Sequence, residues 1–378
     1  MHQEQLATLI AQYSAIGTHR TGSSGDEATS GWLIDQLGRL GLAAWAAPFE
    51  FLRAEGVDAC VIAEGQRIDG TPLHDGGFTA AQGITAALRP IDQCGPGELA
   101  LVMPGQSIDP HNHPLLRGSS AAAGLVLISG DPAGQVLLRN AERMADPLPV
   151  PVLQVALADA APLVSAAERG AAITLLAEGA RRFATATNVI AQRPGAGPPL
   201  VLLTPKSGWF HCAAERGSGV AIVLALAEHA IRQTQPTRPL ILLFTSGHEL
   251  GYAGLRAVLP LLPELNHPGT QWMHIGASLG ARYPSATHLF ASHPAWRDRL
   301  AAALARHGID DIKIHAPAAR PLGEGSVIAD RPFVSTMGTH RYFHSTNDLP
   351  EVAVDAARAL RFGLAWRELL DAVMIDSA

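Results

Sequence analysis

The chain has 378 residues, of which 47% are hydrophobic and 16% are charged, and its formal net charge is −6 at pH 7. This length allows one large domain or two ordinary ones, and the hydrophobic fraction is enough to bury a sizeable core. The low charge content argues against a disordered chain, and the lack of a basic surplus argues against nucleic acid or a membrane surface as a partner.

The cysteines and the N-terminus indicate a cellular compartment. The three cysteines, Cys60, Cys94 and Cys212, form no CxxC pair, which favours a reducing compartment and gives no thiolate zinc site. The first residues lack the basic and apolar regions of a secretory signal, and no stretch reaches 18 uninterrupted apolar residues. We therefore expect a soluble, cytoplasmic protein.

Two helices are expected near the N-terminus. Apolar residues recur at helical spacing over residues 3–15 and again over 26–40, where Gly41 ends the pattern. The polar segment THRTGSSGD between them predicts a turn that ends in a helix cap.

Residues 57–182 have the pattern of a separate β-rich domain. Glycine, proline and aspartate separate short apolar runs, namely GELALVMPG, AAAGLVLISGDPAG, VPVLQVALAD and AAITLLAEG. A polar segment around Leu137 to Met144 is expected to be helical. We interpret this region as an insert in a larger domain formed by residues 1–56 and 183–378.

After residue 185, expected strands alternate with expected helices. The strands are TNVIAQ, PLVLLT, PLILLFTSG, WMHIGAS, THLFAS and DIKIHA, and the helices span residues 218–233, 251–261, 295–307 and 352–373. This alternation predicts an α/β domain with a mixed, mostly parallel sheet and helices on both faces.

Three polar clusters follow expected strands, where ligands bind in α/β sheets. They read TPKSGWFHCAAERGSG, SGHELG and THRYFHSTNDLPE, and they offer Glu215, His248, Glu249 and His344, with Lys206, Arg216 and Tyr342 nearby. Two carboxylates and an imidazole can bind one zinc ion and leave a fourth position open for water or substrate. Glu215 could instead form a salt bridge with Arg216.

Nearly the whole chain resembles the zinc aminopeptidase family, which also contains glutamate carboxypeptidase, glutaminyl cyclase and the transferrin receptor ectodomain. The segments ATNVIAQRPG, RGSGVAIVLALAEHA and HSTNDLPE carry this resemblance. The β-rich insert looks like the protease-associated domain that many members contain. The resemblance implies the aminopeptidase fold and a site for a small-molecule or peptide substrate.

The metal-site pattern of this family is only partly kept. The resemblance places Pro205 and Ser207 at the first histidine and its supporting aspartate, and Ala277 (or Gly276) at a late aspartate. Glu215 stands at the bridging aspartate, His248 and Glu249 at the tandem glutamates, and His344 at the last histidine. The ligands that remain, Glu215, Glu249 and His344, imply one zinc ion in place of two.

Three functions are compatible with this pattern. The first is a single-zinc hydrolase of an amide or peptide-like bond, in which His248 transfers the proton and Tyr342 or Lys206 steadies the oxyanion. The second is an inactive binding or scaffold protein, which the missing catalytic glutamate favours. The third is a cyclase or acyl-transfer enzyme, or a metal-free enzyme that uses Lys206, Glu215 and His248. The insert could also build a homodimer interface.

Overall fold

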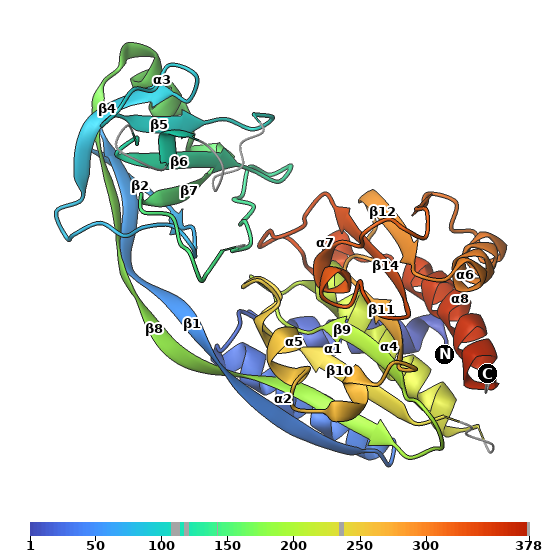
Figure 1. Ribbon diagram of the computed structural model, residues 1–378. Helices are drawn as coiled ribbons and strands as arrows, with labels where there is room; N and C mark the ends of the chain where they lie inside the picture. Colours follow the sequence, from blue (N-terminus) through green and yellow to red (C-terminus); the bar gives the residue numbers. More distant parts are fainter. Residues whose placement is uncertain (107–113, 117–120, 142, 234–237, 376–378) are drawn as a thin grey trace. The chain divides into compact units, whose positions relative to one another are not determined.

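The computed structural model describes residues 1–106, 114–116, 121–141, 143–233 and 238–375 (Figure 1). The chain divides into two compact units. The first comprises Met1–Glu50, Thr185–His248 and Tyr252–Ala378, and the second comprises Phe51–Ala184 and Glu249–Gly251. Two long strands, β1 (Ala43–Ala63) and β8 (Ala172–Arg193), contribute residues to both units.

The first unit contains a mixed sheet in the order β13-β12-β14-β11-β9-β10-β8. Its strands besides β8 are β9 (Leu200–Pro205), β10 (Leu240–Thr245), β11 (Gln271–Ile275), β12 (Pro284–Ala291), β13 (Lys313–Ile314) and β14 (Phe333–His340). The four central strands β10, β9, β11 and β14 run parallel, whereas β8 pairs antiparallel with β10, and β12 pairs antiparallel with β14 and parallel with β13. The expected mixed, mostly parallel sheet is therefore confirmed.

Helices cover both faces of this sheet, as expected. Because side chains alternate along a strand, Leu200 and Leu202 of β9 pack on one face, while Val201 and Leu203 pack on the other. The first face is covered by α1 (Gln3–Ala15), α2 (Ser24–Arg39), α4 (Ser218–Ile231), α6 (Pro294–Arg306) and α8 (Ala356–Ile375). The second is covered by α5 (Ala253–Val258) and the turns η4 (Pro263–Asn266) and η5 (Gly323–Val327).

The last expected helix is interrupted in the structure. A short helix α7 (Pro350–Ala353) precedes α8, and Val354 between them is extended and forms an isolated antiparallel bridge with Ala281. The backbone N–H of Asp355 donates to the carbonyl oxygen of Gly280 at 2.8 Å. The bond from Asp355 to another segment replaces the helical bond that its N–H would otherwise make, whereas the N–H of Val354 still donates to the carbonyl of Pro350 at 3.3 Å. Among the described helices, none combines the length and apolar character that a bilayer crossing requires.

The second unit is rich in strands. It contains β2 (Gln66–Asp69), β3 (Thr71–Pro72), β4 (Ile84–Pro90), β5 (Leu99–Val102), β6 (Gly124–Ser129) and β7 (Val152–Ala156), with helix α3 (Ala161–Arg169) and the turns η1 (Pro114–Leu116) and η2 (Leu157–Asp159). The strands β4, β5, β6 and β7 are parallel, and β4 pairs antiparallel with β8. Its likeness to a protease-associated domain stays a prediction.

The helix expected around Leu137 to Met144 is wrong for the described residues of that segment, which are irregular. Its backbone donors bond to other parts of the unit. The N–H of Arg139 donates to the side-chain oxygen of Gln154 at 2.7 Å, and the N–H of Ala141 donates to the carbonyl of Glu249 at 2.8 Å. Tertiary hydrogen bonds therefore override the local helical tendency.

Candidate functional site

The three polar clusters follow strands that point in the same direction. Lys206 comes directly after β9, Ser246 after β10 and Arg341 after β14. Because β10, β9, β11 and β14 are parallel, their carboxyl ends lie at one edge of the sheet. The structure therefore places these clusters at the edge where ligands bind in this type of fold.

Glu215 lies in a π-helical turn, Ala213–Gly217, that precedes α4. Cys212 enters this turn in the left-handed conformation, with φ of 46°. The carboxylate of Asp348 accepts hydrogen bonds from the backbone N–H groups of Ala214 at 2.8 Å and Glu215 at 3.0 Å. These two bonds satisfy donors that the widened turn leaves without helical partners, and they fix the position of Glu215.

The Glu215 carboxylate is completely buried and contacts the side chains of Arg216 and His344. Its Oε1 atom lies 2.7 Å from a guanidinium nitrogen of Arg216 and 3.3 Å from Nε2 of His344. Its Oε2 atom accepts the backbone N–H of His344 at 3.3 Å. The His344 backbone is left-handed, with φ of 63°, and the ring stacks on Phe343 at 4.0 Å. Glu215 and His344 are thus brought together, 129 residues apart in sequence.

Charge neighbours decide the protonation state of this carboxyl. Burial by itself would raise the pKa of Glu215, but the guanidinium of Arg216 and the imidazole of His344 outweigh burial and hold the pKa well below its ordinary value. Glu215 is therefore an ionised acceptor at neutral pH. The Nε atom of Arg216 donates to the carbonyl oxygen of Ser207 at 2.8 Å, which anchors the guanidinium through a second nitrogen.

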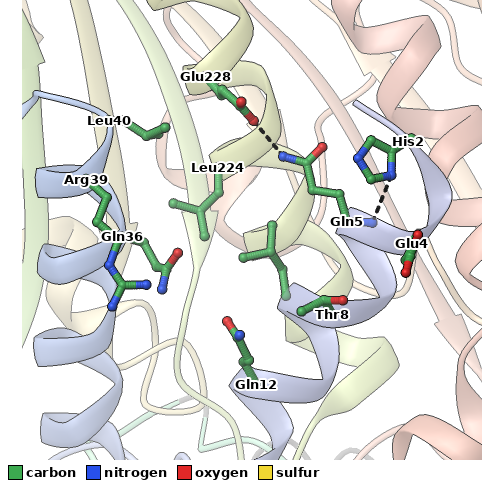
Figure 2. Close-up of a pocket in the computed structure, with 11 residues that line it drawn as sticks. His2, Glu4, Gln5, Thr8, Gln12, Gln36, Arg39, Leu40, Leu224 and Glu228 are labelled. Carbon is green, nitrogen blue, oxygen red and sulfur yellow. Dashed lines mark hydrogen bonds between the residues drawn. The ribbon is translucent and has the colours of Figure 1, made fainter.

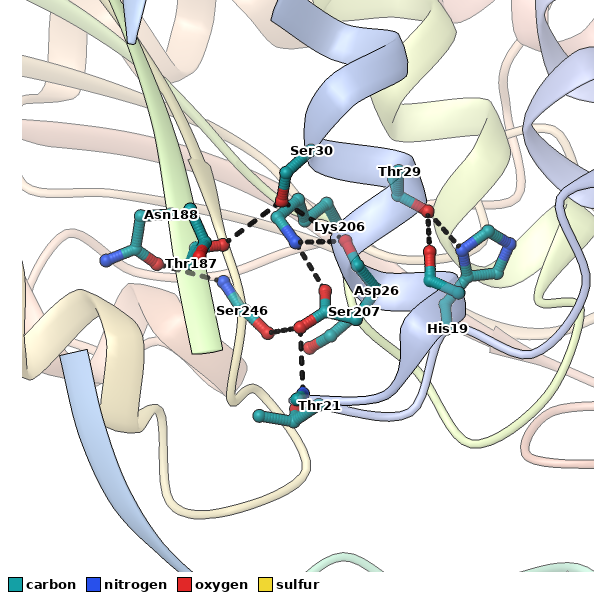
Figure 3. A network of polar contacts seen from close by, with 12 residues as sticks. His19, Thr21, Asp26, Thr29, Ser30, Thr187, Asn188, Lys206, Ser207 and Ser246 are labelled. Atoms are coloured by element: carbon teal, nitrogen blue, oxygen red, sulfur yellow. Dashed lines mark hydrogen bonds and ion pairs between the residues drawn. The ribbon is translucent and has the colours of Figure 1, made fainter. Parts of the chain in front are cut away.

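Lys206 belongs to a different network, which Figure 3 shows. Its ammonium group forms an ion pair with Asp26 at the start of α2 and also donates to the carbonyl oxygen of that residue at 3.1 Å. The second carboxylate oxygen of Asp26 accepts the hydroxyl of Ser246 at 2.7 Å and the N–H of Gly22 at 2.9 Å. The described contacts of the Lys206 ammonium group do not include Glu215, so its suggested role beside that residue stays a prediction.

His248 lies beside a buried glutamate, Glu324. The Nδ1 atom of His248 is 3.9 Å from Oε1 of Glu324, and the ring packs edge-on against Tyr252 at 5.2 Å. Burial raises the pKa of Glu324, whose carboxyl group also accepts the hydroxyl of Thr245 at 2.7 Å. The acid–base role expected for His248 stays a prediction, and the structure gives it a titratable neighbour.

The other two expected site residues are Glu249 and Tyr342. Glu249 is buried and belongs to the second unit, where its backbone carbonyl accepts the N–H of Ala141. Tyr342 is half-buried, with its ring packed against Tyr283 at 6.2 Å between centroids. The roles of Glu249 as a metal ligand and of Tyr342 at an oxyanion stay predictions.

The sequence analysis did not single out Asp26, Asp348 or Glu324. Asp348 lies inside the segment HSTNDLPE that carries the family resemblance, so its place there is a signal that could have found it. Asp26 was expected only as the helix cap that ends the first polar turn, but Ser23 caps α2 and Asp26 lies in its first turn. Glu324 lies in a polar turn that no local pattern marks. Their partners come from strands that lie far away in the sequence.

A zinc ion implied by the resemblance was compared with the donor atoms that the structure brings together. Ligand atoms of Cys212, Glu215 and Asp348 lie within 4.8 Å of one another. However, Asp348 already accepts two backbone N–H groups, and burial raises the pKa of the Cys212 thiol well above its ordinary value. Zinc binds cysteine as the deprotonated thiolate. Arg216 already places a permanent positive charge beside Glu215. This donor set does not fit a zinc ion.

A pocket of about 490 Å³ lies elsewhere on the first unit, between α1, α2 and α4 (Figure 2). Gln5 on α1 donates to the carboxylate of Glu228 on α4 at 2.6 Å within it. None of the sequence-predicted site residues lines this pocket. It is therefore separate from the carboxyl edge of the sheet.

The strands and helices of the first unit have the arrangement of an aminopeptidase-like α/β fold. No protein-family model matches the sequence, and a search of curated proteins finds no match. Solved structures do match over the whole chain, and they confirm the fold that the resemblance implied.

Three of these structures illustrate the range. A zinc aminopeptidase from Bacillus subtilis matches with a TM-score of 0.78 and 14% identity, over 100% of this chain and 96% of that chain. A peptidase precursor from Shewanella amazonensis matches with a TM-score of 0.78 and 18% identity, over 100% of this chain and 96% of that chain. A glutaminyl cyclase from Porphyromonas gingivalis matches with a TM-score of 0.51 and 11% identity, over 98% of each chain.

Proposed function

We propose that this chain is a hydrolase of an amide or peptide-like bond, with Glu215 and His344 at its reaction centre. The observation that carries the proposal is the 3.3 Å contact between Nε2 of His344 and the buried Oε1 of Glu215. The fold supports it, because the structures that share this fold include a zinc aminopeptidase and a peptidase precursor.

The pair has the chemistry of a general base with its orienting carboxylate. In the proposal, the hydrogen of the imidazole is on Nε2, which faces the ionised Glu215 at 3.3 Å, and Nδ1 is the basic nitrogen. The stacked ring of Phe343 limits rotation of the imidazole. In the proposed reaction, His344 takes a proton from water as the water attacks the carbonyl carbon, and later gives it to the leaving amine.

The neighbours named above make a bound metal, zinc in particular, the cofactor to consider. The finer proposal is one zinc held by Glu215, Glu249 and His344, but the guanidinium of Arg216 already contacts Glu215. In the proposed reaction, the chain's own residues therefore carry out the proton transfers. A cytoplasmic location remains part of the proposal.

A second candidate, a binding protein without turnover, is favoured by a specific observation. Both buried cations at this sheet edge are paired with carboxylates of the chain itself, Lys206 with Asp26 and Arg216 with Glu215. Such internal pairing leaves these cations less able to stabilise a negative charge that develops on a substrate.

Turnover of a substrate panel separates the two candidates. Full-length protein is assayed with aminoacyl anilides, dipeptides and peptides that begin with glutamine, beside His344→Gln and the control His267→Gln. His267 is exposed and precedes β11, at the opposite edge of the sheet. We expect measurable hydrolysis that falls by roughly 100-fold or more in His344→Gln and is unchanged in the control. Equal rates in all three proteins would reject the assigned role, and saturable binding without turnover would favour the second candidate.

A further inference from the structure

Arg216 holds an unusual place in the site. Its side chain is completely buried, and one guanidinium nitrogen lies 2.7 Å from Oε1 of Glu215. The Nε atom donates to the carbonyl oxygen of Ser207 at 2.8 Å, so two nitrogens of the guanidinium have partners. Charged side chains are almost never fully buried unless they are paired, which makes this ion pair a specific feature of the local structure.

The same oxygen of Glu215 also faces Nε2 of His344 at 3.3 Å. A metal ion can bind between a carboxylate oxygen and an imidazole nitrogen that face each other. In this site a guanidinium approaches that oxygen. It supplies one positive charge and two or more N–H donors in a fixed plane, and it stays protonated at every accessible pH.

The backbone around Arg216 is shaped to admit its side chain. Gly208 lies beside the arginine stem, and a Cβ atom there would stand 2.4 Å from Sγ of Cys212 and 3.5 Å from Cγ of Arg216. Cys212 begins the π-helical turn in the left-handed conformation, and its carbonyl oxygen accepts the backbone N–H of Arg216 at 2.9 Å. The missing side chain at Gly208 therefore leaves room for the thiol of Cys212, with the stem of Arg216 in van der Waals contact beside it.

The buried charge of Glu215 is balanced without a metal ion. A second carboxylate, that of Asp348, lies 3.5 Å from Nε2 of His340. Arg216 carries a permanent positive charge against Glu215. A divalent ion at the same oxygen would lie within a few ångströms of that cation, and the repulsion at this distance weakens binding strongly in a buried site.

We propose that Arg216 is a built-in cation that takes the place of a metal ion at Glu215, so that this chain gains zinc affinity only when the guanidinium is removed. The proposal rests on the proposed function for the assignment of Glu215 and His344 to the reaction centre. Its own content is a statement about metal binding.

The test measures zinc binding to the full-length protein by titration calorimetry and by elemental analysis after dialysis. The variants are wild type, Arg216→Gln, Arg216→Lys and the control Arg358→Gln. Arg358 is another buried arginine, paired with Asp311 in the same unit. We expect one zinc per chain in Arg216→Gln, bound at least roughly 100-fold more tightly than in wild type, Arg216→Lys or the control.

A second variant guards against misfolding of Arg216→Gln, which leaves a buried carboxylate without its cation. In Glu215→Gln/Arg216→Gln both charges are absent, and we expect a folded protein without zinc affinity. Stoichiometric zinc in wild type that Glu215→Gln removes would overturn the proposal, whether or not Arg216→Gln folds. Zinc binding to folded Arg216→Gln no tighter than to wild type would also overturn it.

Activity and metal binding give separate answers. If the wild type hydrolyses no substrate while Arg216→Gln gains zinc, the built-in cation is supported and the proposed hydrolase is rejected. If the wild type both binds zinc at Glu215 and hydrolyses substrates, the hydrolase stands and the built-in cation is rejected.

Discussion

Lys206, directly after β9, forms a buried ion pair with Asp26 at the start of α2, 180 residues earlier in the chain. Both side chains are almost completely shielded from water. The pair therefore joins α2 to the carboxyl edge of the sheet, where the site lies. This placement makes it a structural connection whose removal can be measured directly.

Lys206→Met should destabilise the protein by about 3–5 kcal/mol, because Asp26 would keep a buried negative charge without its cation. Urea unfolding followed by circular dichroism measures the change. The double variant Asp26→Asn/Lys206→Met removes both charges and should recover a large part of the loss. A cost below about 1 kcal/mol for the single variant would show that the pair is not a net stabilising contact.

Gly208→Ala should lower the free energy of unfolding by about 1–3 kcal/mol, because the new Cβ would stand 2.4 Å from Sγ of Cys212. Combining it with Cys212→Ala should relieve the clash and restore most of that loss. Gly31→Ala is the matched control. Gly31 lies inside α2, and a Cβ there would meet nothing within 4 Å, so alanine should stabilise the helix by about 0.5–1 kcal/mol. Equal effects at the two glycines would contradict the steric account.

Asp348→Asn should cost about 1–3 kcal/mol, because one of the two backbone N–H groups at Ala214 and Glu215 would face an amide N–H₂ group in place of an oxygen. The same substitution should lower turnover if Glu215 acts as proposed, since the turn that positions it is loosened. Asp371→Asn is the control, at a half-buried carboxylate on α8 that pairs with His229. It should change the free energy of unfolding by no more than about 0.5 kcal/mol and leave turnover unchanged. A fully stable Asp348→Asn would show that the turn holds itself.

The stability of this protein should fall as the pH is lowered from about 6.5 towards 4. Burial lowers the pKa of His274 to about 4, whereas an unfolded histidine titrates near 6.5. Between these values the unfolded state binds the proton and the native state does not, so stability is present above pH 6.5 and is lost as the pH falls through this window. His274 contributes up to about 3 kcal/mol of this loss.

Urea unfolding at pH 7.0 and 5.0 measures the effect, and His274→Gln should reduce the difference between the two values. His19, whose burial lowers its pKa to about 3, titrates in the same direction and accounts for part of the remainder. The exposed His267→Gln variant should behave like wild type. A pH dependence identical in wild type and His274→Gln would contradict the assignment to that residue.

Much of the fold could be predicted from local patterns. Helix α1 covers the residues that its apolar spacing predicted, and the uninterrupted apolar run of β9 marked a strand buried on both faces. The order of polar clusters after strands placed Glu215 and His344 at one sheet edge. The segment around Leu137 was mispredicted because its donors bond to Gln154 and Glu249, which no local pattern shows.

The ion pairs of the site could not be predicted in the same way. Glu215 was expected either as a metal ligand or as a partner of Arg216; the 2.7 Å contact confirms the pairing, and the ligand role stays a prediction. Lys206 was a candidate catalytic residue, but its partner Asp26 comes from a helix far away in the sequence. Pairing of buried charges depends on which segments meet, and that is a property of the tertiary structure.

The division of the first unit by an insert has a consequence for synthesis. Leu33 and Leu37 of α2 belong to a core that also contains Tyr13 of α1, and the next buried member along the chain is Val189. About 150 residues separate Leu37 from Val189, which takes on the order of ten seconds to synthesise. Throughout that time the apolar faces of α1 and α2 lack the partners that the sheet supplies. The nascent chain is therefore exposed to aggregation and to chaperones before its first helices can fold onto the sheet.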